Sequence, residues 1–161
     1  MASTQRRVKR GLLDERELAA WRGMLETHSR IVAMLDSELE REHDLPLSSY
    51  EVLMNLADAD GQRMRMGELA ERLLLSRSGI TRLADRLVGQ GLIERERCTD
   101  DGRGYFARLT PAGRAKIRVA RPAHLAGVRR HFLGALEPSE IDALGAIWAR
   151  LAGQPQKPPL D

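Results

Sequence analysis

Apolar residues recur every three or four positions along the first third of the chain. The stripe runs through Leu18, Trp21, Leu25, His28, Val32, Leu35 and Leu39. This spacing places the side chains on one face of an α-helix, close to a heptad seam. It predicts a helix from Asp14 to Glu42, roughly 40 Å long at about 1.5 Å per residue. So long a helix needs a surface to pack on, and a second subunit is a natural candidate.

A series of shorter elements follows the break at Pro46. Ser48 and Glu51 form a capping-box pattern that predicts a second helix over Ser49–Ala59. The sequence DADGQR after it is typical of a loop. A third, short helix is predicted from about Met66 to Leu73, and the LLLS that follows it is typical of a turn.

The middle of the chain changes from helical to alternating spacing. Ser76 is a suitable cap for a fourth helix over Arg77–Gln90, which Gly91 ends. LIERER and YFARL then alternate apolar and polar residues around the turn CTDDGRG, which predicts a two-stranded ribbon.

The last third returns to helix. Thr110 caps a fifth helix whose first residue is Pro111, and this helix extends to about Leu136 with a bend at Pro122. A sixth helix is predicted over Pro138–Ala152. The fold class expected is therefore mainly α with a small β-ribbon.

Charge is unevenly distributed, although the net charge is only +3. Residues 11–60 carry four basic and twelve acidic side chains, a net charge of −8. Residues 61–135 carry sixteen basic and seven acidic ones, a net charge of +9. A basic central module indicates a polyanionic partner, although charge alone is equally compatible with a solvated helical surface.

Composition bears on the cellular compartment of the protein. The single cysteine, Cys98, excludes an intramolecular disulfide and gives no sign of an oxidising compartment. No signal peptide is evident, and no apolar run approaches the roughly 20 residues of a membrane span. We expect a soluble, cytoplasmic protein with no membrane partner.

The segment MGELAERLLLSRSGITRLADR, residues 66–86, has the pattern of a helix-turn-helix. Leu69, Leu73, Ile80 and Leu83 supply the facing apolar positions, and Ala70 supplies the small contact. The glycine common in the turn is missing, because Leu74 and Leu75 occupy it. The second helix begins with short hydroxyls and long cations, which reach phosphates and base edges in a major groove. These candidate DNA contacts are Ser76, Arg77, Ser78, Thr81 and Arg82, and the alternative is an ordinary amphipathic surface helix.

The ribbon is suited to serve as a wing beside this helix. Arg103, between Gly102 and Gly104, is a candidate for the tip, where a narrow minor groove attracts arginine. One of the two aspartates before it is expected to pair with a nearby arginine and fix the shape of the wing. Arg95, Arg97 and Arg108 on the strands are candidate contacts to flanking phosphates.

The segment LSRSGITRLADRLVGQGLIERERCTDDGRGYFARLTPAG resembles the MarR (multiple antibiotic resistance regulator) family. The matching runs are Arg86-Leu87, Gly91-Leu92-Ile93, Arg95, Asp101-Gly102-Arg103 and Leu109-Thr110-Pro111-Ala112-Gly113. The resemblance extends to the long first helix and the two C-terminal helices. Arg86 lies in a matching run and is a further candidate DNA contact.

The resemblance implies a homodimeric winged helix-turn-helix regulator, usually a repressor, that binds a palindromic double-stranded operator. A small ligand or an oxidant would release it. It also implies that Asp101 supports Arg103 and that the N- and C-terminal helices form the dimer. The expected organisation is a basic arm (1–12), a helical dimerisation region (13–45 and 111–152), a DNA-binding lobe (46–110) and a flexible tail (153–161).

Effectors of this family, often aromatic acids, usually lie between the dimerisation helices and the DNA-binding lobe. The candidates here are Trp21, Arg22, His28, Tyr50 and Met54, an aromatic wall with a cation that would suit an aromatic carboxylate. We hypothesise that Arg22 anchors the anion. Alternatively, Trp21 and His28 are core residues and Arg22 is a surface charge.

Other chemistries find less support. Cys98 stands beside Arg97, which favours the thiolate, so an oxidant-responsive regulator remains an alternative. His124 and His131 lie seven residues apart without further ligands, so neither a metal site nor a cofactor is predicted. No catalytic motif stands out. The remaining alternative is a winged-helix protein-interaction module. Such a module should have a neutral or acidic helix and ribbon, whereas both carry several arginines here.

Overall fold

The computed structural model describes residues 12–97 and 104–153. The helices are α1 (Glu15–His43), α2 (Leu47–Ala57), α3 (Met66–Arg72), α4 (Arg77–Gly89), α5 (Pro111–His131) and α6 (Pro138–Ala152). The strands are β1 (Arg63–Arg65), β2 (Ile93–Arg97) and β3 (Tyr105–Leu109), and 3-10 turns occupy Asp60–Gln62 and Leu133–Ala135. The chain is thus mainly helical with a small sheet, as the sequence predicts.

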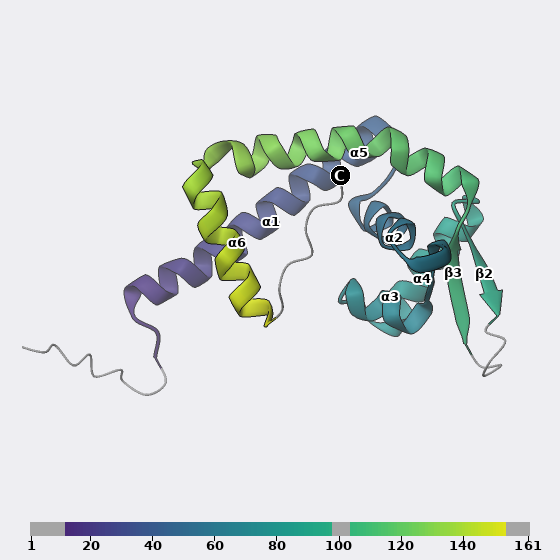
Figure 1. Cartoon of the computed structure of the whole chain (residues 1–161), viewed down its shortest axis with the longest axis horizontal. Helices are drawn as coiled ribbons and strands as arrows, with labels where there is room; N and C mark the ends of the chain where they lie inside the picture. The colour runs from purple at the N-terminus through teal and green to yellow at the C-terminus, as the bar shows by residue number, and fades with distance from the viewer. Residues whose placement is uncertain (1–11, 98–103, 154–161) are drawn as a thin grey trace, which may run out of the picture.

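The two long helices α1 and α5 pack side by side, and a compact lobe lies against one end of the pair. Figure 1 shows α5 running along α1, with α2, α3, α4 and the sheet below one end of the pair and α6 turning down at the other. The C-terminal half of α1 buries Leu35 and Leu39, whereas Trp21 and Leu25 in its N-terminal half are exposed. The apolar stripe of α1 is therefore covered along only part of its length.

The contact between α1 and α5 is close and charged. A β-carbon added at Gly127 would lie 2.7 Å from the Leu35 side chain and 2.8 Å from that of Glu38, so a larger residue there would displace the ends of both side chains. Nearby, Arg130 Nη1 lies 2.8 Å from Glu38 Oε1, and His131 Nε2 lies 2.9 Å from the same oxygen. The hydrogen bond from His131 and the positive charge of Arg130 hold the pKa of Glu38 below its usual value, although burial opposes them.

The start of α2 corrects the sequence prediction. The capping position is Pro46, whose side chain has no atom that could cap the helix. The helix begins at Leu47 rather than at Ser49. The carboxylate of Asp36 in α1 accepts from the backbone N–H of Leu47 at 2.7 Å and takes the place of a local cap. The predicted capping box of Ser48 and Glu51 is therefore wrong, because α1 supplies the acceptor.

The segment DADGQR is also more ordered than predicted. It forms the first 3-10 turn and leads into β1, which adds a third strand to the predicted ribbon. The sheet order is β1-β3-β2, with antiparallel pairs that place Arg63 opposite Arg108 and Arg95 opposite Ala107. β1 thus ties the ribbon to the start of α3.

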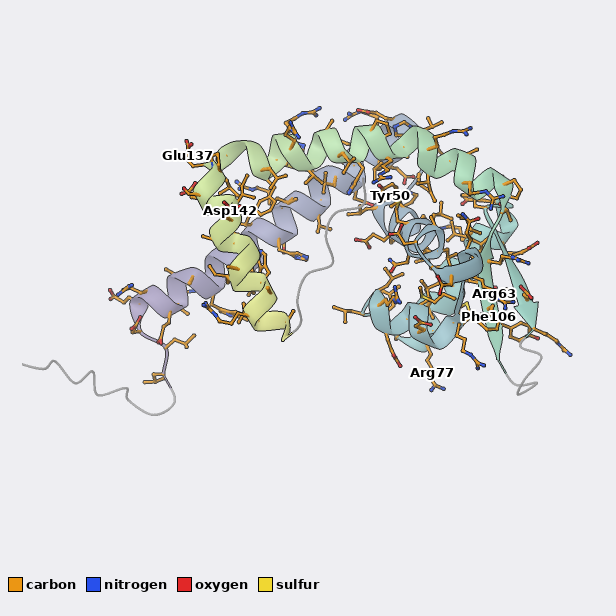
Figure 2. The ribbon with its side chains drawn as sticks, in the orientation of Figure 1. Tyr50, Arg63, Arg77, Phe106, Glu137 and Asp142 are labelled. Carbon is orange, nitrogen blue, oxygen red and sulfur yellow. The ribbon has the colours of Figure 1, made fainter. Side chains whose placement is uncertain are left out.

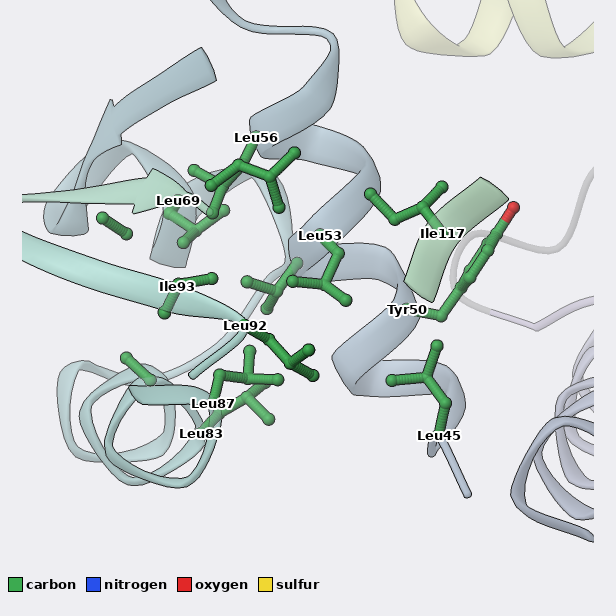
Figure 3. Close-up of a cluster of buried hydrophobic side chains, with 14 of the residues drawn as sticks. Leu45, Tyr50, Leu53, Leu56, Leu69, Leu83, Leu87, Leu92, Ile93 and Ile117 are labelled. Atoms are coloured by element: carbon green, nitrogen blue, oxygen red, sulfur yellow. The ribbon is translucent and has the colours of Figure 1, made fainter. Parts of the chain in front are cut away.

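A single apolar core holds the lobe together. Figure 3 shows side chains from α2, α4 and β2 meeting around Leu53, with Ile117 of α5 at the edge. Leu53, Leu56, Leu69 and Leu87 are essentially inaccessible to solvent. Because α4 buries one face in this core, its opposite face is held at a fixed orientation.

Candidate nucleic-acid interface

The exposed face of α4 carries the polar residues that the sequence singles out. Ser76 caps the helix, since its hydroxyl accepts from the N–H of Gly79 at 3.1 Å. Thr81 donates its hydroxyl to the Arg77 carbonyl at 2.7 Å. On the other face, Ile80, Leu83, Ala84 and Leu87 are buried. The helix therefore separates a packing face from a face free to meet a partner.

Arg77 and Arg82 are the cations of this face. Both are exposed, and within residues 12–97 and 104–153 neither guanidinium is held by a hydrogen bond or an ion pair. Figure 2 shows Arg77 pointing away from the lobe on the side opposite α5. Two uncompensated arginines on a rigid helix would suit an anionic partner.

Arg86, Arg95 and Arg97, which were also predicted to contact DNA, have partners inside the protein. The Arg95 guanidinium lies 2.9 Å from the Asp85 carboxylate and 3.4 Å from the Thr81 carbonyl. Arg86 donates to the buried hydroxyl of Ser49 at 2.8 Å. Arg97 stands 6.0 Å over the Tyr105 ring. These contacts give each arginine a role in holding the wing or α4 in position.

The outer face of the sheet holds Arg63 and Arg65, which were not predicted as DNA contacts. The Arg63 and Arg65 guanidinium carbons lie 4.7 Å and 5.4 Å from the Phe106 ring centroid. Glu96 pairs with Arg63 at 2.9 Å and with Arg108 at 3.5 Å. Figure 2 shows Arg63 beside Phe106 on the sheet. The sequence signal for β1 was the alternation of polar and apolar residues in RMR, residues 63–65, which is too short to predict a strand on its own.

The tip of the predicted wing lies outside the described residues. This applies to Arg103, to the supporting Asp101 and to Cys98. The roles of these residues therefore stay predictions.

The turn between α3 and α4 contains an unusual leucine. Leu74 has a φ of 53°, in the left-handed region, and its side chain is 93% exposed. A residue with a β-carbon is disfavoured there by about 1 kcal/mol. The turn is closed by the N–H of Leu75, which donates to the Ala70 carbonyl at 2.9 Å. Leu74 thus occupies the position where helix-turn-helix turns commonly have glycine.

The five predicted effector contacts do not gather in one place. Tyr50 is buried and stacks on His124 of α5, with ring centroids 4.5 Å apart. Met54 is partly buried against the core. His28 is near enough to Glu51 for its charge to oppose the rise in the pKa of that carboxyl, which is due mainly to burial. Trp21 and Arg22 lie exposed in the N-terminal half of α1, away from α2.

The contact between α2 and α5 brings His124 and Arg121 close to Tyr50, and neither was predicted from the sequence as an effector contact. His124 Nδ1 is buried and has no hydrogen-bond partner among residues 12–97 and 104–153, and burial holds the pKa of this imidazole below its usual value. Burial likewise raises the pKa of Tyr50, while the charge of Arg121 on α5 opposes that rise. Arg121 is therefore a cation close to Tyr50 and the ring stacked on it.

A separate apolar groove of about 810 Å³ lies where α1 faces α6. Met24, Ile31, Phe132 and Trp148 are among its lining residues, and His28 is the predicted effector contact that reaches it. Trp148 and, three residues later on α6, Leu151 are exposed. The groove thus continues the uncovered part of the α1 stripe.

The described part of the chain offers neither a metal site nor a membrane span. No group of three or more His, Cys, Asp or Glu side chains there is placed to hold a metal ion. His131 is bonded to Glu38, and His124 is stacked on Tyr50. None of the described helices combines the length and apolar character needed to cross a membrane.

Comparison with known proteins gives a consistent result. Residues 43–104 match the sequence profile of the MarR family. The HTH-type transcriptional repressor YetL of Bacillus subtilis (strain 168) is 29% identical over 106 residues, which cover 64% of this chain and 64% of that protein. The chain therefore matches slightly less than two thirds of the length of this curated relative.

Two solved structures are more similar over a longer stretch. AbsC, a MarR family transcriptional regulator from Streptomyces coelicolor, is 37% identical with a TM-score of 0.77, covering 89% of this chain and 99% of that one. Sco3205, a MarR family transcriptional regulator from the same organism solved in complex with DNA, is 33% identical with a TM-score of 0.82 and 88% coverage of both chains.

Proposed function

This chain belongs to the MarR family of transcriptional regulators, and on that premise we propose that it binds a palindromic operator as a homodimer and represses transcription until a small effector releases it. The observation that carries the proposal is the exposed face of α4, where Arg77 and Arg82 stand beside three hydroxyl side chains. Helices of this kind enter a major groove with their N-terminal residues against the base edges. The complex of Sco3205 with DNA supports the same partner.

In this proposal the DNA contacts divide between two elements. Arg77 and Arg82 reach base edges or phosphates from α4, whereas Arg103 enters the adjacent minor groove with Asp101 as its support. Arg86, Arg95 and Arg97 contribute chiefly by fixing α4 and the strands, because each has a partner inside the protein.

Binding to a duplex selected in vitro from a random library by the full-length protein tests this division. We expect affinity to fall steeply with salt, because cations that neutralise phosphates release counterions. Arg77→Ala and Arg82→Ala should weaken binding and change the selected sequence, whereas Arg103→Ala should weaken binding without changing it. Arg129→Ala, at the end of α5 far from the lobe, is the matched control. A salt-independent interaction, or equal and sequence-blind losses at all three arginines, would argue against DNA reading and for a protein-interaction module.

The homodimer is supported by uncovered apolar surface on α1 and α6. Trp21, Leu25, Trp148 and Leu151 are exposed, and the groove between the two helices is lined largely by apolar side chains. Exposed apolar surface that continues a helical stripe is typical of an oligomer interface. Light scattering should give twice the 18.0 kDa mass of the chain, and Leu25→Glu should shift it to a single chain.

The effector is proposed to be a small anionic aromatic compound at the contact between α2 and α5. Support comes from the Tyr50–His124 ring pair and from Arg121, whose charge acts on Tyr50. His28 and Met54 would border this site, whereas Trp21 and Arg22 would not. A thermal-shift screen with aromatic carboxylates should find a compound whose effect Arg121→Ala abolishes. Loss of the effect in Arg22→Ala instead would support the hypothesis that Arg22 anchors the anion.

A separate variant tests the oxidant-responsive alternative. If Cys98 senses no oxidant, oxidant should release Cys98→Ser from DNA to the same extent as the wild type.

A further inference from the structure

The turn of the helix-turn-helix holds a side chain that the fold does not use. Leu74 is 93% exposed, and its neighbour Leu73 packs against the core instead. Its φ of 53° is a conformation that glycine or asparagine adopts more readily than leucine. Leucine at this position therefore adds neither packing nor backbone stability to the described protein.

The position of Leu74 relates it to the candidate DNA face. It lies two residues before Ser76, which caps α4, and three before Arg77, which points away from the lobe. Three consecutive Cα spacings reach at most about 11 Å. In a helix-turn-helix the first helix crosses the DNA backbone and the second enters the major groove, so the turn between them lies at the edge of the groove.

We propose that Leu74 is an apolar contact to operator DNA at the edge of the site. The groups on DNA able to receive it are C–H groups, namely the 5-methyl of thymine and the edge of a deoxyribose. The contact would bury a leucine side chain that the free protein leaves in water, which favours binding without adding charge. This inference rests on the proposed function, since it requires that α4 bind DNA.

The test uses the full-length protein and the duplex that the wild type selects from a random library. Leu74→Asn and Leu74→Gly suit the left-handed backbone, so both variants should melt at or above the temperature of the wild type. Both should bind the duplex about three- to tenfold more weakly. Leu74→Met, which keeps an apolar side chain, should retain most of the affinity.

Salt dependence separates this contact from a phosphate contact. The slope of log K against log salt should be the same for Leu74→Asn as for the wild type, because no phosphate loses a cation. Arg77→Ala should reduce that slope if its guanidinium lies on a phosphate. A second duplex, with deoxyuridine in place of thymine, identifies the DNA group. Loss of the difference between wild type and Leu74→Asn on that duplex assigns the thymine methyl, and its persistence assigns the deoxyribose.

The outcomes are distinguishable from failure of the proposed function. If the wild type selects no duplex at all, DNA binding itself is wrong. If the wild type binds and Leu74→Asn and Leu74→Gly bind equally well, Leu74 contacts something other than DNA and the inference is overturned. A lowered salt slope in Leu74→Asn would overturn it too, because the loss would then come from displaced cations.

Discussion

Arg95 of β2 is joined to Asp85 of α4 by an ion pair of 2.9 Å. The same guanidinium lies 3.4 Å from the carbonyl of Thr81, one turn earlier on the helix. The pair links a strand of the wing to the helix that carries the candidate DNA contacts. Arg95, which was predicted to bind phosphate, thus has partners within the lobe that can account for its position.

We predict that Arg95 supports DNA binding through Asp85 rather than through a phosphate. Arg95→Ala should leave the salt dependence of operator binding unchanged, whereas loss of a phosphate contact would reduce the slope by about one. In stability, a double-mutant cycle with Asp85→Ala should give a coupling of about 0.2–1 kcal/mol, because both side chains are partly exposed. A reduced salt slope in Arg95→Ala would return the residue to the phosphate contacts.

The start of α2 supports a second prediction. Asp36→Ala removes the carboxylate that accepts from the Leu47 N–H and should lower the free energy of unfolding by about 1 kcal/mol, as loss of a helix cap does. Ser48→Ala is the matched control, since the Ser48 side chain makes no capping bond and is exposed. Urea unfolding of both variants measures the difference. A larger loss in Ser48→Ala than in Asp36→Ala would contradict this account of the cap.

These two sites show what sequence reasoning could and could not reach. The cap by Ser76 was predictable because its acceptor and donor lie three residues apart. The cap by Asp36 was not, because its donor lies eleven residues away, beyond the end of α1. Local periodicity determines where a helix lies, whereas contacts between elements depend on packing that a single sequence does not display.

The sheet and the candidate site follow the same division. β2 and β3 were predictable from alternation on both sides of a turn, but β1 is only three residues long and pairs with β3 more than forty residues later. The exposed face of α4 follows from its spacing of apolar residues. The partners of Arg86 and Arg95 do not, because Ser49 and Asp85 meet them only in the folded lobe.

A third prediction concerns the contact between α5 and the residue before β2. A β-carbon on Gly113 would lie 2.2 Å from the Leu92 carbonyl oxygen, far inside contact distance, and 2.6 Å from Leu109. Gly113→Ala should therefore lower the free energy of unfolding by about 2 kcal/mol or more, although alanine is the better helix former. Gly89→Ala, also in a helix but with open space at the β-carbon, should be neutral or stabilising by up to about 1 kcal/mol. Thermal melting should show a lowered melting temperature for Gly113→Ala and an unchanged or raised one for Gly89→Ala.

The last prediction concerns His124, whose ring is stacked on Tyr50 between α2 and α5. Burial holds the pKa of this imidazole below its usual value of 6.5 in the folded state, and no partner in the described part of the chain is placed to stabilise a proton on its Nδ1. As the pH falls through about 6.5, the unfolded chain therefore takes up this proton first. The contribution of neutral His124 to stability is complete above that pH and is lost as the pH falls toward the lowered pKa.

His124→Phe keeps a ring against Tyr50 but cannot be protonated. Between about pH 7.5 and pH 5.5, the free energy of unfolding of the wild type should fall more than that of His124→Phe. Urea titrations at the two pH values measure both changes, and the difference between them isolates His124 from His28, His43 and His131, which are common to both proteins. The nearby Tyr50, whose pKa burial raises, stays neutral across this range. Equal losses in the two proteins would place the pH dependence elsewhere and remove His124 as its source.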